Sequence, residues 1–133
     1  MVLVDTNVLL DIFTADEQWA EWSEEQLLTA VREDELAINP IIYAEASPSF
    51  QTQHDLDRAL KDWPLHHLQL PYEAAFVAGQ AFVRYRREGG LRRSPLPDFY
   101  IGAHAQTAGF VLLTRDHVRY QTYFPELRLI TPG

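Results

Sequence analysis

The fold is decided at the start of the chain by the stretch Val2-Leu3-Val4-Asp5-Thr6-Asn7. Three consecutive apolar residues followed by polar ones predict a short strand that is buried on both faces, as in a parallel sheet. Four later segments are also predicted to be short strands, and segments with helical signals separate them. Short buried strands alternating with helices predict an α/β fold whose parallel sheet is covered by helices on both faces. The further strands are expected at 36–38, 66–70, 111–113 and 127–130.

The segments between the predicted strands carry the signals of helices. Trp19, Trp22 and Leu27 recur at the spacing of one helix face, with glutamates between them. Asn39 is a good N-cap, and Pro40 is a good first residue of a helix. Helices are therefore expected at 16–34, 40–46, 54–62, 71–88 and 98–107, with shorter helical stretches at 7–13 and from Asp116 onwards.

The composition is that of a globular protein. The chain has 133 residues, of which 47% are hydrophobic and 23% charged, and this excludes a disordered or fibrous chain. The length suits a single domain over residues 1–133. The absence of cysteine excludes a disulfide scaffold, a thiolate zinc site and cysteine catalysis. No apolar stretch approaches the ~20 residues that a bilayer requires, so we expect no membrane association and a cytoplasmic protein.

The net charge of −8 argues at first against a nucleic-acid-binding protein, because such binding depends on basic side chains that face phosphates. The charge is unevenly distributed, however. Residues 1–50 contain 11 carboxylates and a single basic residue, Arg32. Five of the chain's 11 basic side chains lie between Arg84 and Arg93. This asymmetry predicts two surfaces of different character.

Two carboxylates directly follow predicted buried strands. Asp5 comes after Val2-Leu3-Val4, and Asp116 comes shortly after the 111–113 strand. Open α/β sheets bind their ligands at the carboxyl ends of strands. We therefore expect Asp5 and Asp116 to face one crevice.

Two more carboxylates lie on apolar faces of predicted helices. Glu45 follows Ile41 by four residues and Ile42 by three, so that it shares their face. Asp98 shares its face with small and apolar residues, among them Gly102 four positions on. Both side chains are therefore expected to point into the protein.

Four carboxylates buried near one another would repel strongly, and no Lys or Arg is spaced on these elements to pair with them. A divalent cation resolves the conflict, and oxygen ligands favour Mg²⁺ or Mn²⁺. Acids around such metals are typical of phosphodiester hydrolysis. Each acid also has a simpler interpretation: Asp5 and Asp98 as N-caps, Asp116 as a cap or turn residue, and Glu45 as a surface residue of a helix placed differently.

Four sequence features stand in a recognisable order along the whole chain. They are Val4-Asp5-Thr6-Asn7-Val8, Glu45 after the second predicted strand, the segment LPDFYIGAHA at 96–105, and Leu112-Leu113-Thr114-Arg115-Asp116. With these features the sequence resembles the PIN-domain family, in particular the small VapC-type toxins of bacterial type II toxin–antitoxin systems.

The resemblance implies a three-layer α/β/α fold with a short parallel central sheet. It also implies an Mg²⁺/Mn²⁺-dependent endoribonuclease that cleaves RNA phosphodiester bonds through a metal-activated water. Such toxins form homodimers, and a cognate antitoxin silences each by covering the site with its C-terminal segment. By position, Asp5, Glu45, Asp98 and Asp116 would be the catalytic, metal-binding acids, and Thr6, Asn7 and Thr114 would orient carboxylates or water.

Basic residues near the predicted site are candidates for RNA contacts. Arg87, Arg92 and Arg93 surround the Gly89-Gly90 pair, and Arg115 precedes Asp116. Their guanidinium groups would bind phosphates. A solvated surface position is the alternative for each of them.

Two other functions stay open at this point. A non-catalytic PIN-like module would bind RNA or protein without a metal. Phosphoaspartate hydrolases and receiver domains also place an Asp after a first strand, but they need a lysine after a later strand. The only lysine here is Lys61, within a predicted helix, which disfavours that second class.

Overall fold

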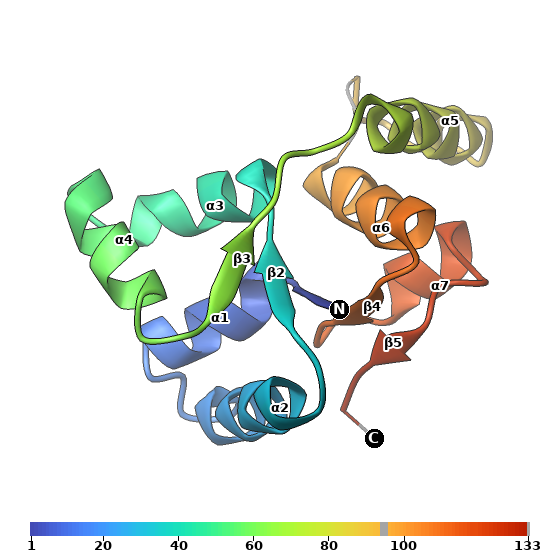
Figure 1. Ribbon diagram of the computed structural model, residues 1–133. Helices are drawn as coiled ribbons and strands as arrows, with labels where there is room; N and C mark the ends of the chain where they lie inside the picture. Colours follow the sequence, from blue (N-terminus) through green and yellow to red (C-terminus); the bar gives the residue numbers. More distant parts are fainter. Residues whose placement is uncertain (94–95, 133) are drawn as a thin grey trace.

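The computed structural model describes residues 1–93 and 96–132 (Figure 1). Within them, five short strands form one sheet in the order β3-β2-β1-β4-β5, and all neighbouring strands are parallel. This confirms the predicted α/β fold with a short parallel central sheet. The strands are β1 (Val2–Val4), β2 (Leu36–Ile38), β3 (Leu65–His67), β4 (Val111–Leu113) and β5 (Leu129–Ile130).

The helices fill the connections between the strands. Asn39 caps the helix that follows β2, since its side chain accepts a hydrogen bond from the Ile42 N–H at 3.0 Å, and Pro40 is the first residue of that helix as predicted. Gly109 ends the helix before β4 in the left-handed conformation, with φ of 74°. The helices are α1 (Thr6–Phe13), α2 (Ala20–Glu33), α3 (Pro40–Ala46), α4 (Gln53–Leu60), α5 (Tyr72–Arg87), α6 (Pro97–Ala108) and α7 (Val118–Tyr123), with a 3-10 turn at Ser47–Ser49.

Several predicted boundaries differ from the structure by a few residues; the strand expected at 127–130, for example, is Leu129–Ile130. Two of the differences have clear local reasons. The helix expected at 16–34 begins only at Ala20, because the Asp16 carboxylate accepts the N–H groups of Gln18 and Trp19 and makes a turn there. The strand expected at 66–70 is Leu65–His67. It pairs residue for residue with β2, which has only three residues, and the chain then leaves the sheet towards α5.

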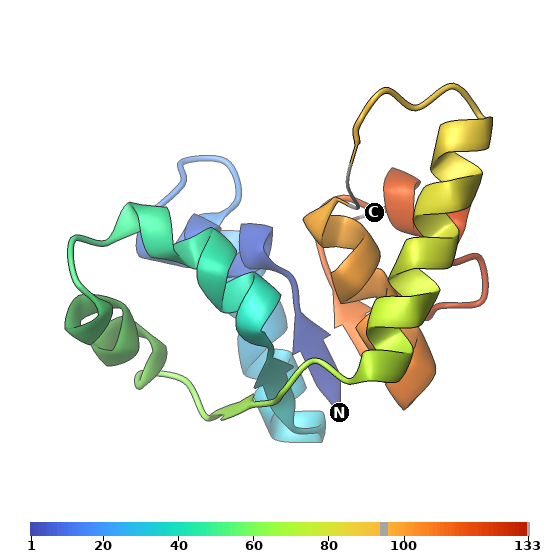
Figure 2. The same ribbon diagram turned by 90° about the horizontal axis from the view of Figure 1, so that it is seen from above.

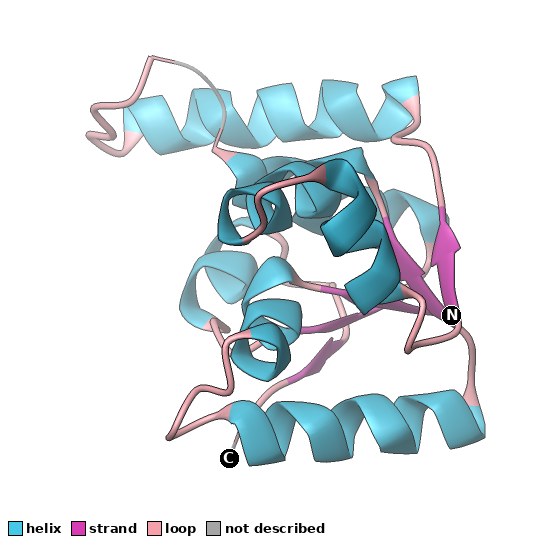
Figure 3. Ribbon diagram, turned by 90° about the vertical axis from the view of Figure 1, so that its left-hand side faces the viewer, coloured by secondary structure: helices cyan, strands magenta, loops and turns pink. Residues whose placement is uncertain are grey.

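Helices cover the sheet on both sides and make the three-layer arrangement. In Figure 2, α1, α3 and α4 (blue to green) lie on one side of the central strands, and α5, α6 and α7 (yellow-green to red) lie on the other. Helix α2 packs against α1, and α5 packs along α6. Figure 3 shows α5 and α2 at opposite ends of the molecule, so the outer side of α5 faces away from the sheet.

The strand order creates a topological switch point beside β1. From β1 the chain passes to β2 and then β3 on one side, and it later returns to β4 and β5 on the other side. Val4 pairs with Leu113, and the Asp5 N–H donates to the Leu113 carbonyl at 2.9 Å. The residues that follow β1 and β4 therefore emerge side by side, where open α/β sheets form their ligand crevice.

The hydrophobic core lies around β1, β2 and the middle of α6. Gly102 of α6 packs directly on the ring of Phe124, and a Cβ at this position would lie 2.5 Å from the ring atom Cε2. Phe124 is buried, so its ring cannot move into solvent. In the part of the chain that the structure describes, no helix is long and apolar enough to span a membrane.

Gly102→Ala should destabilise the domain by about 1–3 kcal/mol, because the added methyl overpacks the α6–Phe124 contact. Urea unfolding measures the effect. The control is Gly79→Ala in α5, where a Cβ meets nothing within 4 Å. That change should be neutral or stabilise by about 0.5–1 kcal/mol, since it removes a mid-helix glycine. Equal stability of the two variants would contradict the packing of α6 on Phe124.

Candidate active site

The four predicted carboxylates, carried by different parts of the chain, line one hollow. Its volume is about 210 Å³, and it opens at the carboxyl ends of β1 and β4. Asp5 follows β1, Glu45 comes from α3, Asp98 from the first turn of α6, and Asp116 follows β4. Thr6, Asn7 and Leu10 complete its wall.

Asp5 is the most buried of the four acids, with 4% of its surface exposed. One carboxylate oxygen accepts the Thr6 N–H at 2.7 Å and so caps α1, as the simpler interpretation of the sequence proposed. The other oxygen accepts the hydroxyls of Thr114 at 2.7 Å and Tyr120 at 3.0 Å. Burial raises the pKa of Asp5 to about 6, and the charge of Asp98 adds to the rise, against these hydrogen bonds.

Glu45 and Asp98 are partly buried. The Thr6 hydroxyl donates to the Glu45 carboxylate at 2.8 Å, which ties α3 to the start of α1. Burial raises the pKa of Glu45, and Asp98 contributes to the rise. Burial likewise raises the pKa of Asp98, although Arg119 lies 3.4 Å from its carboxylate and acts in the opposite direction.

Asp116 is exposed, contrary to the expectation that all four acids are buried. Its backbone N–H donates to the Thr114 hydroxyl oxygen at 3.1 Å, which fixes the turn that carries it. It lines the hollow from just past the end of β4. The hollow therefore has a buried floor at Asp5 and an accessible rim at Asp116.

The three predicted orienting residues form one connected network. The Thr114 hydroxyl donates to Asp5, and the Asn7 amide donates to the Thr114 oxygen at 3.3 Å. The Asn7 carbonyl oxygen accepts the Arg115 N–H at 3.2 Å, so Asn7 links α1 to the loop after β4. Thr6 contacts both Asp5 and Glu45.

Two residues that contact the acids of the hollow, Tyr120 and Arg119, were not identified from the sequence. Tyr120 is fully buried, and its pKa is well above its usual value because of burial and the nearby acids, so its hydroxyl stays a donor to Asp5. It lies four residues after Asp116 on a predicted helical stretch, which is the spacing that could have indicated it. The expectation that no Lys or Arg pairs with the acids was wrong: Arg119 lies three residues after Asp116 on the predicted helical stretch, and its guanidinium lies 3.4 Å from the carboxylate of Asp98 on another element.

Arg115, which was predicted to contact RNA, forms an ion pair with Asp11 in the structure. Its Nε and one terminal nitrogen donate to the two carboxylate oxygens of Asp11 at 2.6 and 2.9 Å, and the guanidinium lies over the Trp19 ring at 5.1 Å. Asp11 is buried and also accepts the Ser23 hydroxyl at 2.8 Å. This ion pair anchors the loop before Asp116 to α1 and, through the Ser23 hydrogen bond, to α2, and it pairs the Arg115 charge with Asp11.

The other predicted RNA-binding arginines are not among the described residues that line the acidic hollow. Arg87 ends α5, and Arg92 and Arg93 follow in the next loop; all three are exposed. Their role in RNA binding stays a prediction.

The donor set of the hollow suits a hydrated divalent cation. Among the residues that the structure describes, no three acidic or histidine side chains stand close enough to enclose an ion by themselves. Mg²⁺ is usually held by one or two carboxylates and retains several waters, so it does not need such a cage. The four carboxylates in the lining, three of them with raised pKa values, fit this mode of binding.

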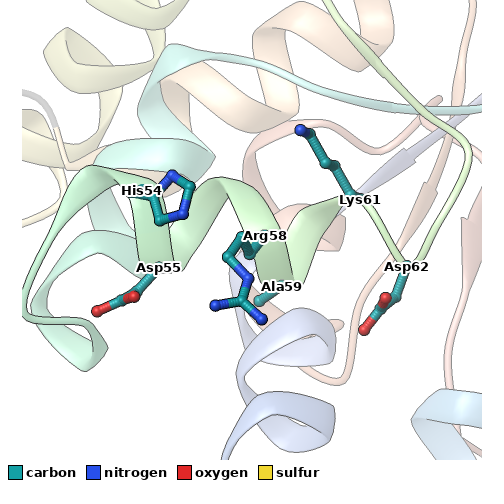
Figure 4. A pocket seen from close by; sticks show the side chains of 6 residues that line it. All are labelled: His54, Asp55, Arg58, Ala59, Lys61 and Asp62. Atoms are coloured by element: carbon teal, nitrogen blue, oxygen red, sulfur yellow. The ribbon is translucent and has the colours of Figure 1, made fainter.

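A larger hollow, of about 660 Å³, lies on the surface around α4, and Figure 4 shows the residues that line it. Its side chains carry both charges and do not converge on a common point, since Lys61 and Asp62 point in different directions. It shares no lining residue with the acidic hollow. The acidic hollow is therefore the candidate active site.

A doubly wound parallel sheet with an acidic hollow at its switch point defines a class of α/β proteins that bind ligands at strand ends. Within that class, the chain belongs to the PIN domain family, whose profile matches residues 2–125. No curated protein matches the chain by sequence.

Solved structures with the same fold cover almost the whole chain. VapBC2 from Rickettsia felis, bound to a promoter DNA fragment, matches with a TM-score of 0.75 at 16% identity, over 100% of both chains. VapBC-1 from nontypeable Haemophilus influenzae matches with a TM-score of 0.73 at 19% identity, over 98% of both chains. A toxin–antitoxin complex from Klebsiella pneumoniae matches with a TM-score of 0.66 at 24% identity, over 100% of this chain and 98% of that one. At these identities the likeness concerns the fold.

The raised pKa of Asp5 predicts a pH dependence of stability in metal-free buffer. The folded state holds this proton more tightly than the unfolded chain, whose value is 3.8. The contribution of Asp5 to the free energy of unfolding is therefore lost as pH rises from about 4 to about 6, by up to ~3 kcal/mol. Asp5→Asn should remove this contribution, so that its stability relative to the native chain increases over that range. Parallel stability curves for the two proteins would refute the pKa assignment.

The Asp11–Arg115 ion pair does not line the hollow, and we predict that breaking it strongly lowers the free energy of unfolding. Asp11→Asn removes the charge that faces a half-buried guanidinium and should lower the free energy of unfolding by about 2–4 kcal/mol. Arg115→Lys should cost less, because it keeps the charge and loses the two-pronged contact. Glu24→Gln on the exposed face of α2 is the control and should change stability by no more than about 0.5 kcal/mol. An Asp11→Asn domain as stable as this control would mean that the pair is not formed.

Proposed function

We propose that the chain is an Mg²⁺- or Mn²⁺-dependent endoribonuclease of the VapC type, the toxin of a toxin–antitoxin pair. The single observation that carries the proposal is the convergence of Asp5, Glu45, Asp98 and Asp116 on one hollow at the sheet's switch point. Membership of the PIN domain family and the fold shared with VapBC complexes support it. The proposed catalytic unit is one PIN domain that spans residues 1–133.

The acidic hollow would hold the cation through the carboxylates of Asp5, Asp98, Asp116 and Glu45. When bound, the cation supplies Lewis acidity, since it activates water and offsets negative charge on the phosphodiester. Burial is the main cause of the raised pKa values of Asp5, Glu45 and Asp98, and neutralising the cluster would remove the mutual repulsion that adds to it. Carboxylates that repel one another without the cation would thus be stabilised when it is bound.

The remaining residues orient the acids and leave the site open to a phosphodiester. Asp5 is held by Thr114 and Tyr120, so its carboxylate cannot rotate freely. Glu45 is held by Thr6. Asp116 at the accessible rim would meet the substrate, and RNA is the substrate that we propose. Arg87, Arg92 and Arg93 would bind RNA phosphates further along the strand.

The acidic front of the molecule suits a basic inhibitor. A cognate antitoxin is proposed to cover the hollow with a segment that places a basic side chain among the acids. Arg119 of this chain already makes a contact of that kind with Asp98. The VapBC structures with the same fold are toxin–antitoxin complexes. We further propose that the chain acts in the cytoplasm as a homodimer.

Asp98→Asn should lower Mn²⁺-dependent cleavage of RNA by at least roughly 100-fold while the domain stays folded, because Asp98 is only half-buried and caps no helix. Cleavage is followed on total cellular RNA, and sequencing of the new RNA ends identifies the cut sites. Asp62→Asn on the exposed surface removes the same charge and should retain activity. Full metal-dependent activity in Asp98→Asn would overturn the assignment.

A non-catalytic PIN-like module is the second candidate. The observations that favour it are the lack, in the described part of the chain, of three acids close enough to enclose an ion, and the ion pair between Arg119 and Asp98. Calorimetric titration with Mn²⁺ distinguishes the two. Binding that is lost in Asp98→Asn supports the nuclease, whereas no binding at millimolar metal would favour the module.

A further inference from the structure

A buried hydrogen bond joins the start of α3 to α6, the two helices that carry Glu45 and Asp98. The side-chain nitrogen Nδ2 of Asn39 and the ring nitrogen Nδ1 of His104 lie 2.9 Å apart. Each of these two residues has only 2% of its surface exposed. Two apolar side chains of similar shape could give about the same stability, so a polar pair at this place points to a role beyond packing.

The direction of this bond is fixed by the other contact of Asn39. Its Oδ1 accepts the Ile42 N–H at 3.0 Å and so caps α3. The amide nitrogen then faces His104 and can only donate, so Nδ1 of the ring accepts. Burial lowers the pKa of His104, which keeps the ring neutral and Nδ1 free to accept. The ring also packs against Phe110, with the two ring centres 5.6 Å apart, so the bond has one defined geometry.

The bond and the two acids lie at different levels of the same helix pair. Helices α3 (teal) and α6 (orange) pack together, and they run in opposite directions in Figure 2. Glu45 follows Asn39 by six positions, and Asp98 precedes His104 by six positions. Six residues span ~9 Å of helix, so both acids stand at about the same height above the bond. A small shift of one helix at the bond would therefore change the spacing of the two acids.

The spacing of Glu45 and Asp98 needs such a support. Both acids line the hollow, and the charge of Asp98 adds to the effect of burial in raising the pKa of Glu45. Like charges favour separation, so other contacts must hold their helices together. Among the residues that the structure describes, the Asn39–His104 bond is the only side-chain hydrogen bond between α3 and α6.

We propose that Asn39 and His104 are positioning residues of the acidic hollow, whose bond fixes α3 against α6 and so holds Glu45 and Asp98 at the separation that a divalent cation requires. Neither residue touches the cation or the RNA, and both act through the helices. Binding sites need their ligating groups held to within ~0.5 Å, which a buried bond between the two helices supplies. The inference deepens the proposed function, on which it rests for the identity of the ligand.

The first test is calorimetric titration of the full chain with Mn²⁺. Asn39→Ser keeps a hydroxyl that can cap α3, but its side chain is too short to reach His104. The Kd for Mn²⁺ should rise at least roughly fivefold. The control is Ala30→Gly at a buried position of α2, a helix that carries none of the four acids. It should lower stability and leave the Kd unchanged. An Asn39→Ser chain that binds Mn²⁺ as the native chain does would overturn the proposal.

The second test asks whether the two residues act through one bond. His104→Leu keeps apolar bulk and removes the acceptor, so it should also raise the Kd for Mn²⁺. Adding it to Asn39→Ser should raise the Kd little further, because the bond is already broken. His104→Asn restores an acceptor near the position of Nδ1 and should recover part of the affinity. Additive losses, or equal losses in His104→Asn and His104→Leu, would contradict a shared bond.

The third test measures the helix spacing in metal-free protein. The chain has no cysteine, so spin labels on Ala44→Cys in α3 and Gln106→Cys in α6, both exposed positions, attach at defined sites. Pulsed electron double resonance gives the distribution of distances between the labels. Asn39→Ser should broaden or shift this distribution, and Ala30→Gly should leave it unchanged.

The spacing measurement separates failure of this inference from failure of the proposed function. An unchanged distribution in Asn39→Ser would overturn the positioning role, whether or not the native chain binds Mn²⁺. A changed distribution in a chain whose native form binds no Mn²⁺ would support the positioning of the two helices and count against the nuclease.

Discussion

The carboxylate of Asp5 is the constraint on which the rest of the site depends. A buried acid must find donors, and Asp5 finds them in three different parts of the chain: the Thr6 N–H, the Thr114 hydroxyl and the Tyr120 hydroxyl. These bonds join the end of β1 to the start of α1, the end of β4 and helix α7. Since the strand order reverses at this point, the acid that holds the segments together also forms the floor of the hollow.

The domain keeps its acids close together at a cost to its stability. Burial and mutual repulsion raise the pKa of Asp5, and the same causes act on Glu45. Arg115 stands next to Asp116 in sequence and could have neutralised the cluster, but its guanidinium pairs with Asp11 instead. The fold thus preserves a concentration of negative charge, which is the behaviour expected where function opposes stability.

Much of this organisation could be predicted from residue patterns. The apolar runs before Asp5 and Asp116 identified two neighbouring strands, and the apolar neighbours of Glu45 and Asp98 placed both acids on the side of the hollow. The contacts of Tyr120 and Arg119 were not predicted, because they depend on how α7 packs against the end of β1 and against α6. The third strand was misplaced by a few residues, since its length is set by the partner strand β2.

The sequence by itself indicated the class of fold and the four candidate acids. Buried strands appear as short apolar runs, and carboxylates at strand ends or on apolar helix faces stand out because burying a charge is costly. The tertiary structure decided how exposed each acid is, which arginine approaches Asp98 and which one is held by Asp11. It also decided that one side of α5 packs along α6 while the other remains exposed. These outcomes depend on contacts between residues distant in sequence, and no local pattern encodes such distances.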